Sequence, residues 1–313
     1  MTLPRRHLPF EAVMLVRRTH ERRFLLGPTA DTRAIIAYEV ARAAVRHQQN
    51  IHGAVSMGNH VHFVLHDTCA CRSDFMRDAM SGVARQLNRH LGREGYVWDA
   101  RSYGETLLLD ANALERMLVY TWLNPVAAGL VDSPYDWPGF IILPRDWGKT
   151  IRIPRPNDRY GRNAPDFIEF TPQPPPGYEN QPLKKTIAHF ERLLEEGLTH
   201  ILKARPPGEQ PSEFTPPSPT ERPSTPSPRS PRRPRFASAN PALRLQAEQQ
   251  HRDFQNLYRR QRQRWKQGQR RQKCVFPPGT LWLRRHAPIR CAATPHDSIG
   301  IFLLERAPVS NAL

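Results

Sequence analysis

Apolar positions mark three strands in the first part of the chain, one with apolar residues on both faces and two in which apolar residues recur at every second position. One run covers 12–18, and two more cover 51–57 and 60–66, with Gly58-Asn59 between them. Successive side chains of a strand point to opposite faces, so Val61, Phe63 and Leu65 would enter a core together. Gly-Asn is a typical two-residue hairpin turn. The pattern therefore predicts a hairpin formed by the second and third runs.

Apolar residues that recur at three- and four-residue spacing predict three helices, over 29–48, 73–92 and 110–124. In the second of them, arginines lie on the side away from the apolar stripe. A further strand or two is expected between 96 and 109. The residues that can cap the three helices are Thr29 or Asp31, Ser73 or Asp74, and Asp110.

The order of these elements is strand, helix, strand, strand, helix, strand. This βαββαβ order predicts an α+β, ferredoxin-like domain with an antiparallel sheet, over 1–148. The third strand of that topology is central. Residues on it are held by neighbouring strands on both sides, which favours a rigid site.

The pattern weakens beyond this domain. A partly helical extension is expected over 149–205, with its helix over 181–204. The Pro/Ser/Arg-rich stretch 206–240 predicts a disordered linker, because it holds too few apolar residues to offset the entropy of ordering. The last part, 241–313, predicts a basic helix over 242–272, followed by short strands. Taken together, these residues form a largely helical and disordered basic C-terminal extension.

Charge points to a polyanionic partner. The chain carries 46 Lys and Arg against 29 Asp and Glu, a formal net charge of +17. Basic contacts to phosphate release condensed counterions, so nucleic acid is the first candidate. No apolar run is long enough to span a bilayer, and no signal peptide is recognisable, so we expect a cytoplasmic protein, nucleoid-associated in a prokaryote, without a membrane partner. Four Cys in 313 residues favour reduced thiols.

His60 and His62 are the first candidates for chemistry. They lie two apart on the third predicted strand, so both imidazoles project from one face and can share a metal ion. Isolated histidines on a strand are more often simply solvated or hydrogen-bonded. The segment His66-x-x-Cys69-x-Cys71 suggests a zinc site, but no second ligand pair accompanies it.

Tyr120 and Asn124 lie one turn apart on one side of the third predicted helix. A tyrosine hydroxyl has a pKa of about 10, so its attack on a phosphodiester needs a metal or a local positive field. The amide oxygen of Asn124 could complete a three-ligand set with the two histidines. Alternatively, Tyr120 is a packed aromatic residue and Asn124 ends its helix before Pro125.

Two segments together resemble a known family. Met57-Gly58-Asn59-His60-Val61-His62, followed by the stretch from Tyr120 to Val131 and then Trp137-Pro138, is similar to the single-tyrosine HUH transposases, specifically the REP-associated tyrosine transposases with an IS200-like domain. The resemblance covers roughly 8–145. Carried over by position, His60, His62 and Asn124 match the metal ligands, and Tyr120 matches the nucleophile. Gly58 departs from the proline that is common in the family.

The resemblance implies an enzyme: a metal-dependent transposase or endonuclease that cleaves and rejoins single-stranded DNA through a 5′-phosphotyrosine intermediate, with Mg²⁺ or Mn²⁺ as cofactor. It further implies palindromic, hairpin-forming repeats as substrate, and we expect a monomer or a homodimer. No nucleotide-binding motif is present, in keeping with a reaction that conserves bond energy. Candidate phosphate contacts are Arg17, Arg18, Arg85 and Arg89.

Two other functions stay open. The first is a DNA-binding protein derived from such a transposase but without catalysis. The second is a phosphohydrolase that uses the His pair and water. Only the tyrosine mechanism leaves DNA covalently attached to the protein, so an adduct separates it from both.

Overall fold

The structure analysed is a computed structural model, which describes residues 4–100, 103–156, 160–161, 163–206, 217–219, 221–222, 234–270 and 274–293. Most of the predicted linker over 206–240 and the end of the predicted last unit lie outside the described residues. Among the described helices, none is both long enough and apolar enough to cross a membrane.

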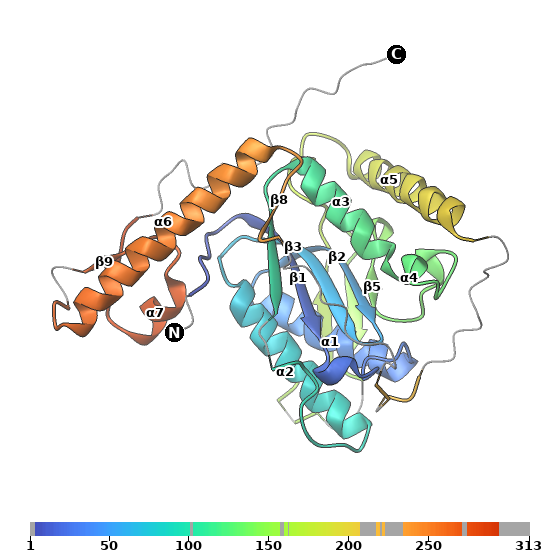
Figure 1. Cartoon of the computed structure of the whole chain (residues 1–313). Helices are drawn as coiled ribbons and strands as arrows, with labels where there is room; N and C mark the ends of the chain where they lie inside the picture. The colour runs from blue at the N-terminus through green and yellow to red at the C-terminus, as the bar shows by residue number, and fades with distance from the viewer. Residues whose placement is uncertain are drawn as a thin grey trace, which may run out of the picture.

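A six-stranded sheet lies at the centre, with the strand order β5-β2-β3-β1-β4-β8 (Figure 1). Neighbouring strands pair antiparallel, except that β8 runs parallel to β4. The predicted ferredoxin-like order is confirmed, with β3 between β2 and β1. Strands β5 and β8 extend it at the two edges. The bounds are β1 Glu11–Arg18, β2 Asn50–Met57, β3 His60–Asp67, β4 Gly104–Leu108, β5 Ile141–Ile142 and β8 Phe236–Ala237.

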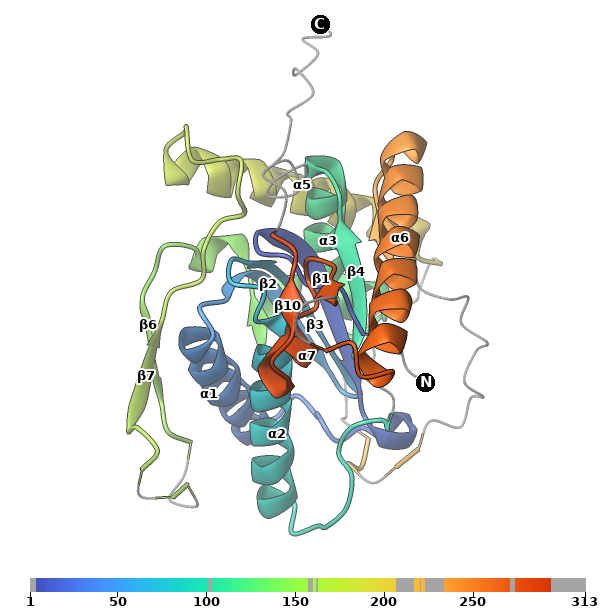
Figure 2. The same ribbon diagram turned by 90° about the vertical axis from the view of Figure 1, so that its left-hand side faces the viewer.

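Helices cover both faces of the sheet. α1 (Ala30–Arg46) and α2 (Arg72–His90) pack on one face, against side chains that include Val61, Phe63 and Leu65. α3 (Ala111–Trp122), α4 (Asn124–Ala127) and α5 (Leu183–Ala204) lie on the other face, and Figure 2 shows the two groups separated by the strands. Each face therefore has its own apolar core, and β3 contributes to both.

The predicted alternation in β2 is interrupted by a bulge. The register of β2 on β3 shifts between Ile51 and Gly53, so Ile51 and Ala54 both join the core under α1 and α2. Val55 and Met57 consequently lie on the opposite face, in a small apolar cluster with Trp137. The regular alternation expected over 51–57 would put Ile51 and Val55 on one face. That expectation was wrong, because the extra residue of a bulge reverses the direction of the side chains that follow.

Two predicted helix boundaries also need correction. α2 begins at Arg72, not at Ser73 or Asp74, because the carboxylate of Asp67 accepts hydrogen bonds from the backbone N–H groups of Cys71 (2.7 Å) and Arg72 (3.2 Å). The helix that was expected to end at Asn124 ends at Trp122, and a second, short helix, α4, begins at Asn124 with Pro125 in its first turn. Proline is tolerated there because the first helical N–H groups have no partner within the helix.

Gly53 brings α3 close to the sheet. A Cβ atom at this position would lie 2.8 Å from both Leu118 Cδ2 and Trp122 Nε1. The Trp122 indole donates to the carbonyl oxygen of Ile142 at 2.8 Å, which ties the same helix to the neighbouring strand β5. The position of α3 over β2 and β3 is therefore fixed at its C-terminal half.

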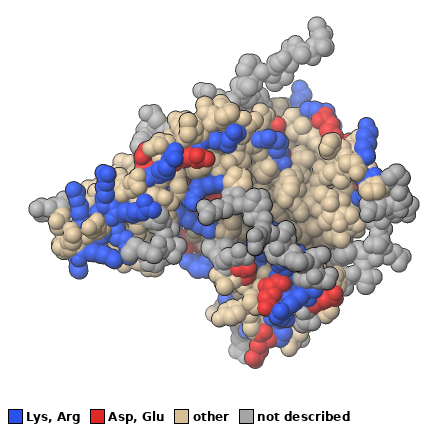
Figure 3. Space-filling model, viewed as in Figure 1, with Lys and Arg blue, Asp and Glu red and all other residues tan. Residues whose placement is uncertain are grey.

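The remaining described elements extend this body. β6 (Ile151–Pro154) and β7 (Phe167–Phe170) form a hairpin beside α1, and the 3-10 helices are His20–Arg22, Pro134–Asp136 and Pro144–Asp146. The predicted basic helix is α6 (Pro241–Lys266), and it carries a gathering of Lys and Arg at its outer end (Figures 1 and 3). Beyond it lie β9 (Val275–Phe276), the unpredicted helix α7 (Leu281–His286) and β10 (Arg290–Cys291).

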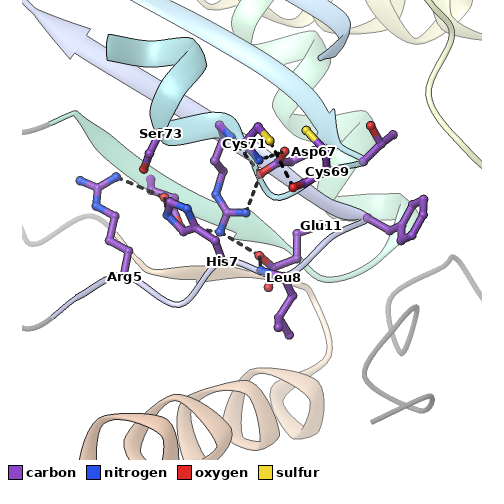
Figure 4. A network of polar contacts seen from close by, with 12 residues as sticks. Arg5, His7, Leu8, Glu11, Asp67, Cys69, Cys71 and Ser73 are labelled. Carbon is purple, nitrogen blue, oxygen red and sulfur yellow. Dashed lines mark hydrogen bonds and ion pairs between the residues drawn. The ribbon is translucent and has the colours of Figure 1, made fainter. Parts of the chain in front are cut away.

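A buried charge cluster fastens the start of α2 to three strands. Arg72 is fully buried, and its guanidinium contacts Asp67 (3.0 Å), Glu11 (2.8 Å) and Glu105 (3.1 Å). Figure 4 shows Arg5, His7, Glu11 and Asp67 converging here. Burial acts to raise the pKa of Glu105, but the Arg72 cation and its hydrogen bond, together with His7 and Arg5, outweigh burial and hold this pKa at about 2. The cluster joins β1, β3 and β4 through one cation.

Acid should destabilise the fold through His52. This side chain is buried, its Nδ1 lies 2.8 Å from the carbonyl oxygen of Gln173, and burial lowers its pKa to about 3. Below about pH 6.5, His52 binds a proton in the unfolded chain but stays neutral in the folded chain. The free energy of unfolding that is present above this pH therefore decreases as pH falls toward 3. We expect His52→Gln to remove a dependence of up to about 1.4 kcal/mol per pH unit.

Urea unfolding of the wild type and the variant at several pH values between 7 and 5 measures this difference. Parallel curves for the two proteins would contradict the assignment of this acid sensitivity to His52.

Candidate active site

His60 and His62 lie at the start of β3, on the face covered by α3. Their ring centroids are 4.8 Å apart and the rings are inclined by 70°. His62 is only 1% exposed, whereas His60 is partly exposed. The turn at Gly58-Asn59 puts His60 directly opposite Met57 on β2. The structure therefore places both imidazoles together, on a central strand and at one end of the sheet.

The neighbouring strands form the floor of the site. His62 lies between Val55 on β2 and Val16 on β1, and His60 lies opposite Arg18 on β1. Directly paired residues of antiparallel strands project from the same face, so Arg18 shares the face of the histidines. The flanking strands thus place Arg18, Val16 and Val55 on the same face of the sheet as the imidazole pair.

Asn59 orients the first histidine, a role that the sequence alone did not suggest. The Asn59 Oδ1 atom lies 2.7 Å from His60 Nδ1. If Nδ1 donates this hydrogen bond, the lone pair of the neutral imidazole is on Nε2, the nitrogen that can then bind a metal. The Asn59 side chain also donates to the carbonyl oxygen of Arg22 at 3.3 Å. In the sequence, only the adjacency of Asn59 and His60 could have indicated this contact.

Tyr120 lies on α3, the helix that covers the face of the sheet on which the two histidines lie, and its ring contacts that of His62. Its ring centroid is 5.8 Å from that of His62, with the rings inclined by 69°. Leu114, Leu118 and Trp122 hold the buried side of this helix, while Tyr120 remains 50% exposed. An exposed phenol that touches a buried imidazole can receive a substrate from solvent. The tyrosine and one predicted metal ligand are therefore neighbours in space although they are 58 residues apart in the sequence.

Asn124 is the first residue of α4, one turn beyond Tyr120, and is partly buried. Its backbone carbonyl accepts from the N–H group of Ala128 at 3.0 Å. α3 ends at Trp122 and α4 begins at Asn124, so Asn124 lies where one helix ends and the next begins, close to the helix end that the alternative interpretation expected. Its role as a ligand stays a prediction.

The donor chemistry around the histidines is compatible with a divalent ion. Among the described residues, no group of three or more His, Cys, Asp or Glu could hold a metal. A site here would therefore consist of two imidazoles and an amide oxygen, a neutral set that leaves open positions for phosphate oxygens. The residues that could hold Mg²⁺ or Mn²⁺ are His60, His62 and Asn124.

The four arginine candidates are not equivalent. Arg18 lies opposite His60, but Arg17 projects toward the other face, since its cross-strand partner is Val61 of the α1 and α2 core. Arg85 and Arg89 are exposed on α2, also on that other side of the sheet. Only Arg18 shares the site, and the strand register that shows this was not deducible from composition.

In the part of the chain that the structure describes, His66, Cys69 and Cys71 do not form a group that could hold a metal ion. His66 Nε2 lies 2.9 Å from the carbonyl oxygen of Phe10, and the two thiols contact the backbone carbonyls of His47 and Cys69. These three side chains each have a different partner. Each of the three side chains therefore contacts a backbone carbonyl oxygen in the structure.

Two comparisons with solved structures give partial matches. The chain is similar to a REP-associated tyrosine transposase bound to a REP hairpin, at 18% identity and a TM-score of 0.38, over 47% of this chain and 84% of that one. It is also similar to a protein from Deinococcus radiodurans R1 that is assigned as a transposase, at 20% identity and a TM-score of 0.27, over 34% and 84% of the two chains. No protein-family model matches the chain, and no curated protein does.

Proposed function

We propose that this protein is a metal-dependent transposase that cleaves and rejoins single-stranded DNA, with Tyr120 as nucleophile. The observation that carries the proposal is the contact between Tyr120 and His62. A half-exposed phenol on one helix meets a buried imidazole on the central strand, and a second imidazole lies 4.8 Å from the first. A purely structural tyrosine at this position would need neither the exposure nor the histidine pair.

The reaction is a transesterification. The Tyr120 oxygen attacks the phosphorus atom of a phosphodiester, a bond to phosphorus forms, and the bond from phosphorus to the 3′ oxygen breaks. The products are a 5′-phosphotyrosine and a free 3′-hydroxyl, and the phenol proton ends on the leaving oxygen. A 3′-hydroxyl of another strand can reverse the step. Because the phosphotyrosine conserves the bond energy, rejoining needs no nucleotide cofactor.

His60, His62 and Asn124 are the residues that would hold a metal. The chemistry that Mg²⁺ or Mn²⁺ would supply there is neutralisation of charge on the scissile phosphate. Arg18 adds a fixed positive charge on the same face. Buried His62 and the hydrogen-bonded His60 keep the donors in place, so substrate binding needs little rearrangement of the site.

The proposed substrate is a single strand with palindromic repeats that fold into hairpins. The net charge of +17 supports a polyanionic partner, and the basic end of α6 offers phosphate contacts away from the site. Phosphate contacts of this kind position a strand without reading its sequence. The protein would act as a monomer or homodimer in the cytoplasm, on the nucleoid of a prokaryote.

Replacing either histidine with alanine should abolish cleavage that depends on Mn²⁺. His60→Ala and His62→Ala each remove one of only two imidazoles, and an amide with one imidazole holds a divalent ion poorly. We expect no cleavage of a hairpin-containing strand above background at any Mn²⁺ concentration, measured on denaturing gels. Thermal melting without metal should change little for His60→Ala, because that side chain is partly exposed.

Asn124→Ala provides the graded comparison. With both histidines retained, we expect cleavage to persist but to need a higher Mn²⁺ concentration. An unchanged Mn²⁺ requirement in Asn124→Ala would remove it from the ligand set. Full cleavage by the His60→Ala and His62→Ala variants would overturn the proposed metal site.

A further inference from the structure

A groove of about 600 Å³ runs between α3 and α5, and Tyr120 forms part of its wall. The two helices lie side by side in Figures 1 and 2. Such a volume is in the range of pockets that enclose small organic molecules, about 300–1,000 Å³. Because Tyr120 lines the groove, a molecule bound there would lie next to the proposed nucleophile. Its apolar wall consists of Val119, Leu123, Leu193 and Ile201.

The walls are held by close packing. A Cβ atom at Gly197 would lie 2.8 Å from both Val119 Cγ1 and Leu123 Cδ1, so α5 approaches α3 closely at this point. Phe190 and Leu194 of α5 are buried in the core that also contains Trp122. Both helices are thus anchored, and the groove is a feature of the packed structure.

Two carboxylates lie in the groove wall, and Glu196 pairs with Arg192 at the surface (2.7 Å), so Glu115 is the directed acceptor. Glu115 lies in the groove wall, and the hydroxyl of Tyr178 and Nε2 of His189 (2.9 Å) both contact its Oε1 atom. Its second oxygen, Oε2, is the acceptor that this side chain offers to a bound molecule. A carboxylate repels a phosphate but accepts hydrogen bonds from the exocyclic amino groups of cytosine, adenine or guanine. Thymine has no such group.

We propose that this groove binds one unstacked nucleobase that carries an amino group, next to the phosphate attacked by Tyr120. The inference rests on the proposed function, because it takes the single strand to run past Tyr120. Apolar walls and an aromatic ring suit the flat face of a base, and Glu115 suits its amino edge. The groove would then select which phosphodiester is cleaved, by reading the base beside it.

Binding of short, labelled strands of dC, dA or dT to the full chain without metal tests this inference, because it requires no cleavage. Fluorescence anisotropy should show dC and dA binding about tenfold more tightly than dT. Glu115→Gln keeps an oxygen for Tyr178 and His189 but replaces the second acceptor with a donor. We expect this variant to lose most of the preference while its affinity for dT stays the same or rises.

Two bulky variants separate the groove from the general surface. Ile201→Trp fills the groove and should weaken binding of all three strands, whereas Leu202→Trp, on an exposed neighbouring position outside the groove lining, should not. Equal affinity for dC and dT in the wild type, or unchanged binding by Ile201→Trp, would overturn the inference. An altered oligomeric state of Ile201→Trp without an effect on DNA would assign the groove to self-association and also overturn it. If the base preference holds but Tyr120 forms no adduct, the proposed function is wrong while the inference about base binding stands.

Discussion

Tyr120→Phe is expected to abolish covalent attachment of DNA completely. The substitution removes only the oxygen that would bond to phosphorus, and no neighbouring group replaces it. The aromatic ring remains against His62, so folding and affinity for single strands should change little. Denaturing electrophoresis of the protein with a labelled hairpin strand and Mn²⁺ measures the adduct, and anisotropy measures binding in the same samples.

Tyr135→Phe is the matched control. Tyr135 is 37% exposed, against 50% for Tyr120, but it lies on a different segment, the 3-10 helix Pro134–Asp136. Its loss should leave the adduct intact. If Tyr120→Phe still forms the adduct, Tyr120 is not the nucleophile. If the wild type binds hairpins but never forms an adduct, the protein is a DNA-binding relative of such enzymes without catalysis.

Arg72→Met is expected to destabilise the fold by about 3–5 kcal/mol at neutral pH. Methionine fills much of the same volume but leaves Asp67, Glu11 and Glu105 close together, with their shared cation gone. Burial then raises the pKa of Glu11 and Glu105 in the folded state. A raised folded-state pKa gives stability that is present at low pH and is lost as pH rises. The deficit relative to the wild type should therefore shrink between pH 7 and pH 5.

Chemical unfolding of both proteins across this pH range gives the two free energies. Arg77→Met, on the same helix, is the control, because the Arg77 side chain is 63% exposed and pairs with Asp74 and Asp78 at the surface. Surface ion pairs contribute little, about 0–1 kcal/mol. A deficit for Arg72→Met that is small, or that grows on acidification, would contradict the proposed role of this cation.

The sequence was sufficient for the order of strands because the elements that carry it have strong local signals. The Gly58-Asn59 turn, the apolar stripe of α2 and the alternation in β3 each indicate one structure. Once β2 and β3 form a hairpin, the ferredoxin-like order places β3 in the centre and His62 inside the sheet. The helical periodicity also predicted that Tyr120 and Asn124 lie on one side of a helix. It could not give the distance from Tyr120 to His62.

What the sequence could not give depends on contacts between distant residues. The bulge in β2 follows from pairing with β3, and it moves Val55 and Met57 to the side of the histidines. The start of α2 is set by Asp67, which lies on the preceding strand. Strand β8 lies within the stretch 206–240 that was predicted to be a disordered linker, and that prediction was wrong at this point, because Phe236 and Ala237 pair with Leu107 and Leu108 of β4. From the sequence, Glu115 is one polar residue of an amphipathic helix. Its contact with His189 and its place in the groove depend on the packing of α5 against α3.

Peptide mapping of the protein–DNA adduct tests the central proposal most directly. The wild-type protein is incubated with Mn²⁺ and a pool of hairpin-containing single strands, the covalent product is isolated under denaturing conditions, and the DNA is trimmed with nuclease. Trypsin then releases the segment from Met117 to Arg145, which contains both Tyr120 and Tyr135. Fragmentation in a mass spectrometer should locate the nucleotide phosphate on Tyr120. A nucleotide on Tyr135 or on any other residue, or cleaved DNA without a protein-linked nucleotide, would contradict the mechanism.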